Sequence, residues 1–203
     1  RGRALLAAQV AAVVDNLAAG AEELAAHPYG CRVLQRVLEH CSPAAKLPVL
    51  RALEGAAPRL ARDQYGNYVL QHVLAWGRPR DRRAVLRAVD RHLVAYARHK
   101  HASNVVERAL SPGGGGTARE RRALVERLLR ARDGRHPALP TLVCDPYANY
   151  VVQKALDVAD DDQRRAIAHE LKAHAGSLKN YTFGKHILSR LEKAWSSTKK
   201  ATS

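Results

Sequence analysis

The chain has 203 residues, and its 34 Lys and Arg outnumber its 19 Asp and Glu, which gives a formal net charge of +15 at pH 7. A basic excess of this size favours a polyanionic partner, with nucleic acid ahead of an anionic membrane surface. The sequence holds no apolar run long enough to cross a bilayer and no signal-peptide pattern at its start, which argues against a membrane-embedded or secreted protein.

The chain opens on a stretch that its apolar pattern predicts to be helical. Residues 1–26 have the pattern of the last two helices of a unit whose first helix lies upstream. The sequence contains no Met, not even at position 1, so we expect it to be part of a longer protein.

A six-residue pattern then recurs along the chain and marks a repeat. Its copies begin at Gly30, Gly66, Ala102 and Ala148, and the next step leads to Gly184. The steps are 36 residues long, except for one of 46 from Ala102 to Ala148. A fixed period in this range is typical of a solenoid built from stacked units. Because no stretch alternates like a strand, the sequence predicts an all-α solenoid with three helices per unit.

The repeat divides this single domain into six segments. They are a remnant of a preceding repeat (1–26), a first repeat (27–62), a second (63–98), a third with a loop insertion (99–144), a fourth (145–180), and a C-terminal cap and tail (181–203). In the first repeat, the two helices that follow the recurring pattern are expected at about residues 44–53 and 56–61.

The second repeat illustrates how the recurring pattern folds. Four apolar side chains fall on one side of a helix and should pack inward: Val69, Leu70, Val73 and Leu74. Asn67 and Gln71 lie one above the other on the opposite, polar side, because residues i and i+4 share a face. The other three repeats place a similar polar pair on the same face.

The turn before each of these helices has its own pattern. Asp63 and Asp145 are expected to cap the helices that follow them. Tyr29, Tyr65 and Tyr147 recur at one position, and we expect them to pack between units. The long third repeat contains the glycine-rich run 111–116, which predicts a flexible linker and lacks the Lys-Ser/Thr of a P-loop.

Hydrogen-bond chemistry connects the polar pairs to nucleobases. Glu107 only accepts, and on the Watson–Crick edge only guanine offers two adjacent donors. A Gln carries both a donor and an acceptor and suits uracil or adenine, so its partner must decide between them. Asn67 and Asn149 suit uracil, and the small Cys31 suits adenine.

These motifs resemble those of the Pumilio (PUF) family of RNA-binding proteins. The resemblance covers residues 27 to about 195, and it implies a right-handed α-solenoid of three-helix repeats, similar to armadillo and HEAT superhelices. It also implies that each repeat reads one base, with the chain antiparallel to the RNA. The four repeats then read 5′-UGUA-3′ and look like the last four of an eight-repeat array. His101 departs from the family pattern, which usually has an aromatic residue there.

The resemblance assigns three sets of side chains to RNA. The base edges are read by Cys31 with Gln35, Asn67 with Gln71, Ser103 with Glu107, and Asn149 with Gln153. The bases stack on Arg32, Tyr68, Asn104 and Tyr150. Candidate phosphate contacts are Arg36, His72, Arg108 and Lys154. Residues 182–188 resemble the family's C-terminal cap, to which we assign no base.

Two alternatives use similar surfaces. A peptide-binding solenoid of the armadillo type also presents Asn ladders, and a PUF-like ribosome-assembly factor grips nucleic acid without sequence preference. An enzyme is not expected, because the histidines have no acid or nucleophile at a catalytic spacing. No metal site or cofactor is expected either, and the three cysteines (Cys31, Cys41, Cys144) fit reduced thiols in an intracellular protein.

The sequence thus predicts a monomeric, cytoplasmic protein that binds single-stranded messenger RNA. Binding in 3′ untranslated regions would regulate the translation and stability of the message. Regulatory proteins are the expected partners of the convex face.

Overall fold

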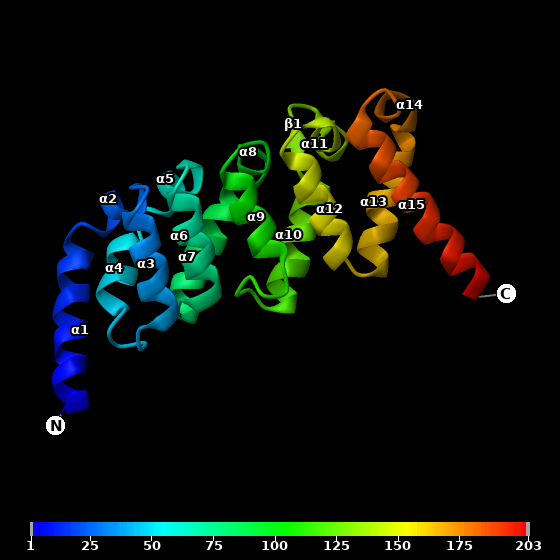
Figure 1. Cartoon of the computed structure of the whole chain (residues 1–203). Coiled ribbons are helices and arrows are strands. Elements are labelled where there is room, and N and C mark those ends of the chain that lie inside the picture. Colours follow the sequence, from blue (N-terminus) through cyan, green and yellow to red (C-terminus); the bar gives the residue numbers. More distant parts are fainter. Residues whose placement is uncertain (1, 202–203) are drawn as a thin grey trace.

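The computed structural model describes residues 2–201, with side-chain placements for residues 5–6 and 8–191. This part of the chain forms 15 helices and one pair of short strands. The helices stack in a long, arched row with the two ends of the chain far apart (Figure 1). The predicted α-solenoid is confirmed, but the prediction of a purely helical fold missed the two strands.

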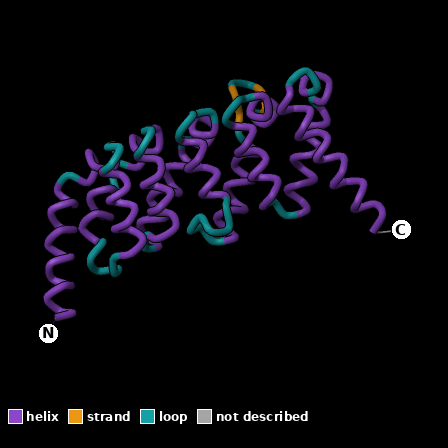
Figure 2. Tube along the Cα trace, viewed as in Figure 1, coloured by secondary structure: helices purple, strands orange, loops and turns teal. Residues whose placement is uncertain are grey.

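The helices follow the predicted repeat. After α1 (Gly2–Ala19) and α2 (Ala21–Ala25) come the first repeat's α3 (Gly30–His40), α4 (Leu47–Leu53) and α5 (Ala57–Arg62), and the second repeat's α6 (Gly66–Trp76), α7 (Pro79–Arg91) and α8 (Leu93–Ala97). The third has α9 (Ala102–Leu110), α10 (Ala118–Arg130), β1 (Arg132–Asp133), β2 (His136–Pro137) and α11 (Leu139–Cys144), and the fourth has α12 (Ala148–Val158), α13 (Asp161–Ala173) and α14 (Ala175–Leu178). Loops gather at the upper and lower edges of the row (Figure 2).

The last helix, α15 (Thr182–Ala201), covers the C-terminal end of the stack and runs through the segment expected to be a tail. Residues 1, 202 and 203, which belong to the predicted remnant and tail, lie outside the described residues. No helix in the described part of the chain combines the length and apolar character needed to span a bilayer.

A side chain in the preceding turn caps each of the helices α3, α6, α9 and α12. Asp63 Oδ1 accepts from the backbone N–H groups of Tyr65 (2.8 Å) and Gly66 (2.7 Å), and Asp145 does the same before α12. In the other two turns His27 and His99 take this place through Nδ1. These bonds satisfy N–H groups that the first turn of a helix leaves free.

The predicted inward side of these helices is buried. Val69, Leu70, Val73 and Leu74 all lie in the core, as predicted. One exception is Val33, which is 45% exposed, whereas Val69 at the same position of the next repeat is fully buried. Val33 borders an apolar groove between α1 and α3, since no helix packs beside α3 on that side in the described structure.

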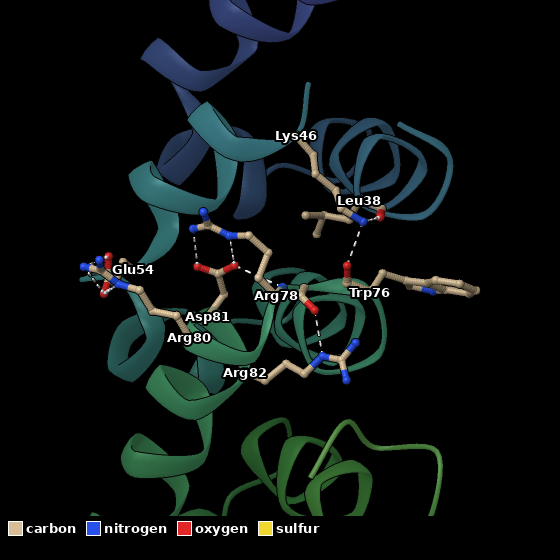
Figure 3. A network of polar contacts seen from close by, with 9 residues as sticks. Leu38, Lys46, Glu54, Trp76, Arg78, Arg80, Asp81 and Arg82 are labelled. Atoms are coloured by element: carbon tan, nitrogen blue, oxygen red, sulfur yellow. Dashed lines mark hydrogen bonds and ion pairs between the residues drawn. The ribbon is translucent and has the colours of Figure 1, made fainter. Parts of the chain in front are cut away.

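Basic side chains hold the carboxyl ends of α3 and α6 (Figure 3). Lys46 is buried, and its Nζ donates to the carbonyl oxygens of Leu38 (2.8 Å) and Trp76 (2.7 Å). Arg82 donates to the carbonyl oxygen of Gly77 at 2.7 Å. The end of a helix leaves carbonyls free and carries partial negative charge, so cations suit this place. Lys46 thereby ties two neighbouring repeats together.

The glycine-rich run is packed rather than free, which corrects the prediction of a flexible linker. Gly114 is buried, and Gly115 has a φ of +76°, which favours glycine. A Cβ at Gly115 would lie 1.8 Å from the carbonyl oxygen of Leu74, so the loop rests directly on the end of α6. The rest of the insertion forms the β1–β2 hairpin.

Candidate nucleic-acid interface

The four predicted pairs sit on neighbouring helices. Helices α3, α6, α9 and α12 pack against one another in chain order, so their pairs form one row across the repeats (Figure 1). The upper member of each pair is buried, which corrects the expectation of two side chains on an open polar face. These buried members are Cys31, Asn67, Ser103 and Asn149.

Asn67 shows why the upper position is buried. Its Nδ2 donates to the carbonyl oxygens of Asp63 (2.9 Å) and Gln64 (3.0 Å) in the capping turn. Its Oδ1 accepts from Gln71 Nε2 at 3.1 Å. Both donors of Asn67 are therefore used by the backbone, and Gln71 is held with its Oε1 free to accept. Asn149 makes the same contacts before Gln153.

The first repeat presents its Gln in the opposite sense. Cys31 Sγ donates to the carbonyl oxygen of Pro28 (3.4 Å) and offers no oxygen to Gln35. Gln35 is only 3% exposed, and its Nε2 has no hydrogen-bond partner in the described structure. Arg32 lies beside its Oε1 at 3.5 Å. Gln35 thus holds a buried, unused donor where Gln71 has a free acceptor.

The third repeat places a carboxylate in a pocket shared by three helices. The pocket has a volume of about 300 Å³ and is lined by Tyr68, Gln71, Asn104, Glu107, Arg108, Ser111 and Lys154. Burial raises the pKa of Glu107 above its usual value, and the charge of Lys154 acts against this shift. A planar group with two donors would find an acceptor here between cationic walls.

The predicted stacking residues flank this row. Arg32, Tyr68 and Tyr150 are exposed, and Asn104 is half-buried. The guanidinium carbon of Arg32 lies 5.7 Å from the centre of the Tyr68 ring, within cation–π range. Side chains of neighbouring repeats can therefore present flat surfaces toward one another.

The tyrosines of the capping turns do not act as predicted. Tyr29 is 78% exposed and Tyr147 is also exposed, while only Tyr65 packs partly against the core. The contact between repeats is made instead by the buried Tyr96, whose hydroxyl donates to the carbonyl oxygen of Pro58 at 3.3 Å. Sequence reasoning missed Tyr96 because it lies outside the recurring motif.

The four candidate phosphate contacts differ in their surroundings. Arg108 and Lys154 both line the pocket of Glu107. Arg36 makes an ion pair with Glu39 at 2.7 Å. The ring nitrogen Nδ1 of His72 lies 3.0 Å from the carbonyl oxygen of Tyr68, which only accepts, so this nitrogen donates. The structure thus brings two of the four together beside a reading position.

The described residues contain no group of three His, Cys, Asp or Glu side chains that could hold a metal ion. The chemistry available to this surface is hydrogen bonding, stacking and ion pairing.

Comparison with known proteins identifies the same repeat. A Pumilio-family RNA-binding repeat model matches residues 21–53 and 58–89, and a NOP9-like PUF repeat domain model matches residues 83–186. Pumilio homolog 2 of Xenopus laevis is 49% identical over 74 residues, which cover 36% of this chain and 6% of that protein.

Solved structures share the fold over most of the chain. PUF-8 in complex with PBE-RNA matches with a TM-score of 0.81 and 38% identity, over 90% of this chain and 53% of that one. The Puf3 RNA binding domain bound to a Cox17 RNA 3′ UTR recognition sequence matches with a TM-score of 0.75 and 28% identity, over 88% and 54%. The chain therefore spans about half the length of these solved chains.

Proposed function

Because the chain belongs to the Pumilio (PUF) family of RNA-binding repeat proteins, we propose that its four repeats bind single-stranded RNA with the core sequence 5′-UGUA-3′. The observation that carries this proposal is the row of four polar pairs on α3, α6, α9 and α12, each with a different balance of donors and acceptors. The RNA-bound states of PUF-8 and Puf3 support RNA as the ligand.

The guanine of this core is assigned to the third repeat. Ionised Glu107 accepts through both oxygens, and guanine presents N1–H and N2–H₂ side by side. Ser103 adds a hydroxyl next to the carboxylate. Arg108 and Lys154 in the same pocket supply positive charge for the phosphates around that base.

The uracils and the adenine are separated by how each Gln is held. Gln71 and Gln153 spend a donor on the Asn above them and offer Oε1, which suits the N3–H of uracil. Gln35 keeps Nε2 unused, which suits the acceptor N1 of adenine. One residue type can thus read two bases, depending on its neighbour one turn earlier.

We further propose that the targets are messenger RNAs, bound in 3′ untranslated regions in the cytoplasm, and that the outcome is control of translation and stability. The chain would act as a monomer on the RNA, with regulatory proteins on its convex face.

Binding of matched short RNAs tests the proposed core sequence. UGUA should bind more tightly than UAUA by about 1–3 kcal/mol, because the exchange for adenine leaves the carboxylate of Glu107 without its donors. Competition titration with labelled UGUA measures the difference. Equal affinity for both RNAs would defeat the assignment of guanine to Glu107.

The pH dependence of binding tests the role of the carboxylate. The ionised form of Glu107 accepts guanine, and its pKa is raised, so affinity for UGUA should be full above that pKa and fall as the pH drops through it. In the variant Lys154→Ala the fall should begin at a higher pH, because the charge that lowers the pKa of Glu107 is gone. UUUA serves as the control and should not follow this titration. A Lys154→Ala profile identical to that of the unmodified protein would contradict the coupling.

A second candidate function is RNA binding without sequence preference, as in the ribosome-assembly alternative. The match of residues 83–186 to a NOP9-like model keeps it in view. The competition titration separates the two, because a non-specific binder would treat UGUA and UAUA alike.

A further inference from the structure

A basic pocket lies apart from the reading row. It has a volume of about 430 Å³ and is formed by the end of α7, the start of α8, and the end of α10 with β1, near the upper edge in Figure 1. Four arginines line it, and one carboxylate does: Arg91, Arg127, Arg130, Arg132 and Asp90. None of its lining residues belongs to the reading helices α3, α6, α9 and α12.

The positive charge of this pocket is only partly compensated. Asp90 is taken by Arg127, with Oδ1 and Nε 2.9 Å apart. Arg130 is 81% exposed and has only a 3.7 Å contact with Glu126. Arg91 and Arg132 are exposed and make no ion pair with any described residue. Two guanidinium groups therefore face the pocket rim without a carboxylate.

The insertion of the third repeat builds one wall of the pocket. In the second and fourth repeats only His92 or His174 separates the long outer helix from the short one that follows. In the third repeat the β1–β2 hairpin stands in this place and carries Arg132. Its tight turn uses Gly134, whose φ is +61°.

Contacts with the second repeat fix this hairpin. Arg98 donates to Asp133 Oδ2 at 2.7 Å and to Thr141 Oγ1 at 2.6 Å. The backbone N–H of Ala138 donates to the carbonyl oxygen of Ala131 at 2.9 Å and closes the base of the loop. Arg132 is thus presented from an anchored element, in a form that the other described repeats lack.

We propose that this pocket is a second RNA contact, which holds phosphodiester groups of the bound RNA outside the four bases that are read. Planar guanidinium groups match phosphate oxygens through paired hydrogen bonds. The site contains no aromatic platform for a base apart from the ring of His92, which already stacks on Tyr96. The choice of RNA as the source of the phosphates rests on the proposed function above.

Salt-dependent binding of a short and a long RNA tests the proposal. The short RNA carries little beyond UGUA, and the long one embeds UGUA in unrelated single-stranded flanks. In the double variant Arg91→Ala with Arg132→Ala, we expect unchanged affinity for the short RNA. For the long RNA, the loss of two phosphate contacts should reduce the salt slope by about 1.4, or about a sevenfold difference in the affinity lost between 50 and 200 mM salt.

A matched control removes the same charge elsewhere. Arg51→Ala with Arg119→Ala changes two exposed arginines that do not line the pocket. Equal losses in both double variants would reduce the effect to overall charge and overturn the site. An unchanged slope for the long RNA, together with the loss of a phosphoserine peptide, would assign the pocket to a protein partner and also overturn it. The preference of the short RNA for UGUA over UAUA reports separately on the proposed function.

Discussion

Exchanging the reading pair of the third repeat for that of the second is expected to change the preferred base from guanine to uracil. The double variant Ser103→Asn with Glu107→Gln replaces a carboxylate by an amide that the new Asn can orient, as Asn67 orients Gln71. The carbonyl oxygens of His99 and Lys100 stand where those of Asp63 and Gln64 bind Asn67, so the turn can hold the new side chain. The variant should prefer UUUA over UGUA, with a swing between bases of about 2–4 kcal/mol.

The reverse exchange is the matched control for this experiment. Asn67→Ser with Gln71→Glu should make the second repeat read guanine, so that UGGA becomes the preferred RNA. Competition titration of the RNAs measures both variants, and thermal unfolding shows whether each still folds, since Ser103 and Asn67 are both buried. A folded Ser103→Asn/Glu107→Gln variant that still favours UGUA would show that guanine is recognised elsewhere.

Replacing Lys46 by Met is expected to lower the free energy of unfolding by about 2–4 kcal/mol, since two charge-assisted hydrogen bonds are lost and two carbonyls lose their donor. The affected carbonyls belong to Leu38 and Trp76, at the ends of α3 and α6. Urea denaturation measures the change in midpoint. Arg51→Met, at an exposed position in the adjoining helix α4, provides the control and should have little effect. If both variants share one midpoint, Lys46 does not hold the two repeats together.

The sequence predicted what depends on local periodicity. The inward face of Val69, Leu70, Val73 and Leu74 follows from helical geometry alone, as does the vertical spacing of Asn67 and Gln71. The capping role of Asp63 follows from its place before the helix. These features need no knowledge of neighbouring repeats.

What the sequence did not predict depends on contacts between distant residues. Lys46 meets Trp76 across 30 positions of the chain. The glycine-rich run looked flexible because its packing depends on the carbonyl of Leu74 in the preceding repeat. Tyr29 looked like a packing residue because its motif recurs, yet the structure leaves it exposed.

The bonds from Asn67 to the carbonyls of Asp63 and Gln64 have a consequence for engineering. They make the reading side chain and the turn before it one exchangeable cassette, which begins at the capping residue and ends at the Gln. Transplanting only the two reading side chains moves the lettering without its mount, and the graft works where the host turn already offers the same carbonyls. A library of base specificities is therefore better assembled from whole turn-and-helix segments than from isolated point changes.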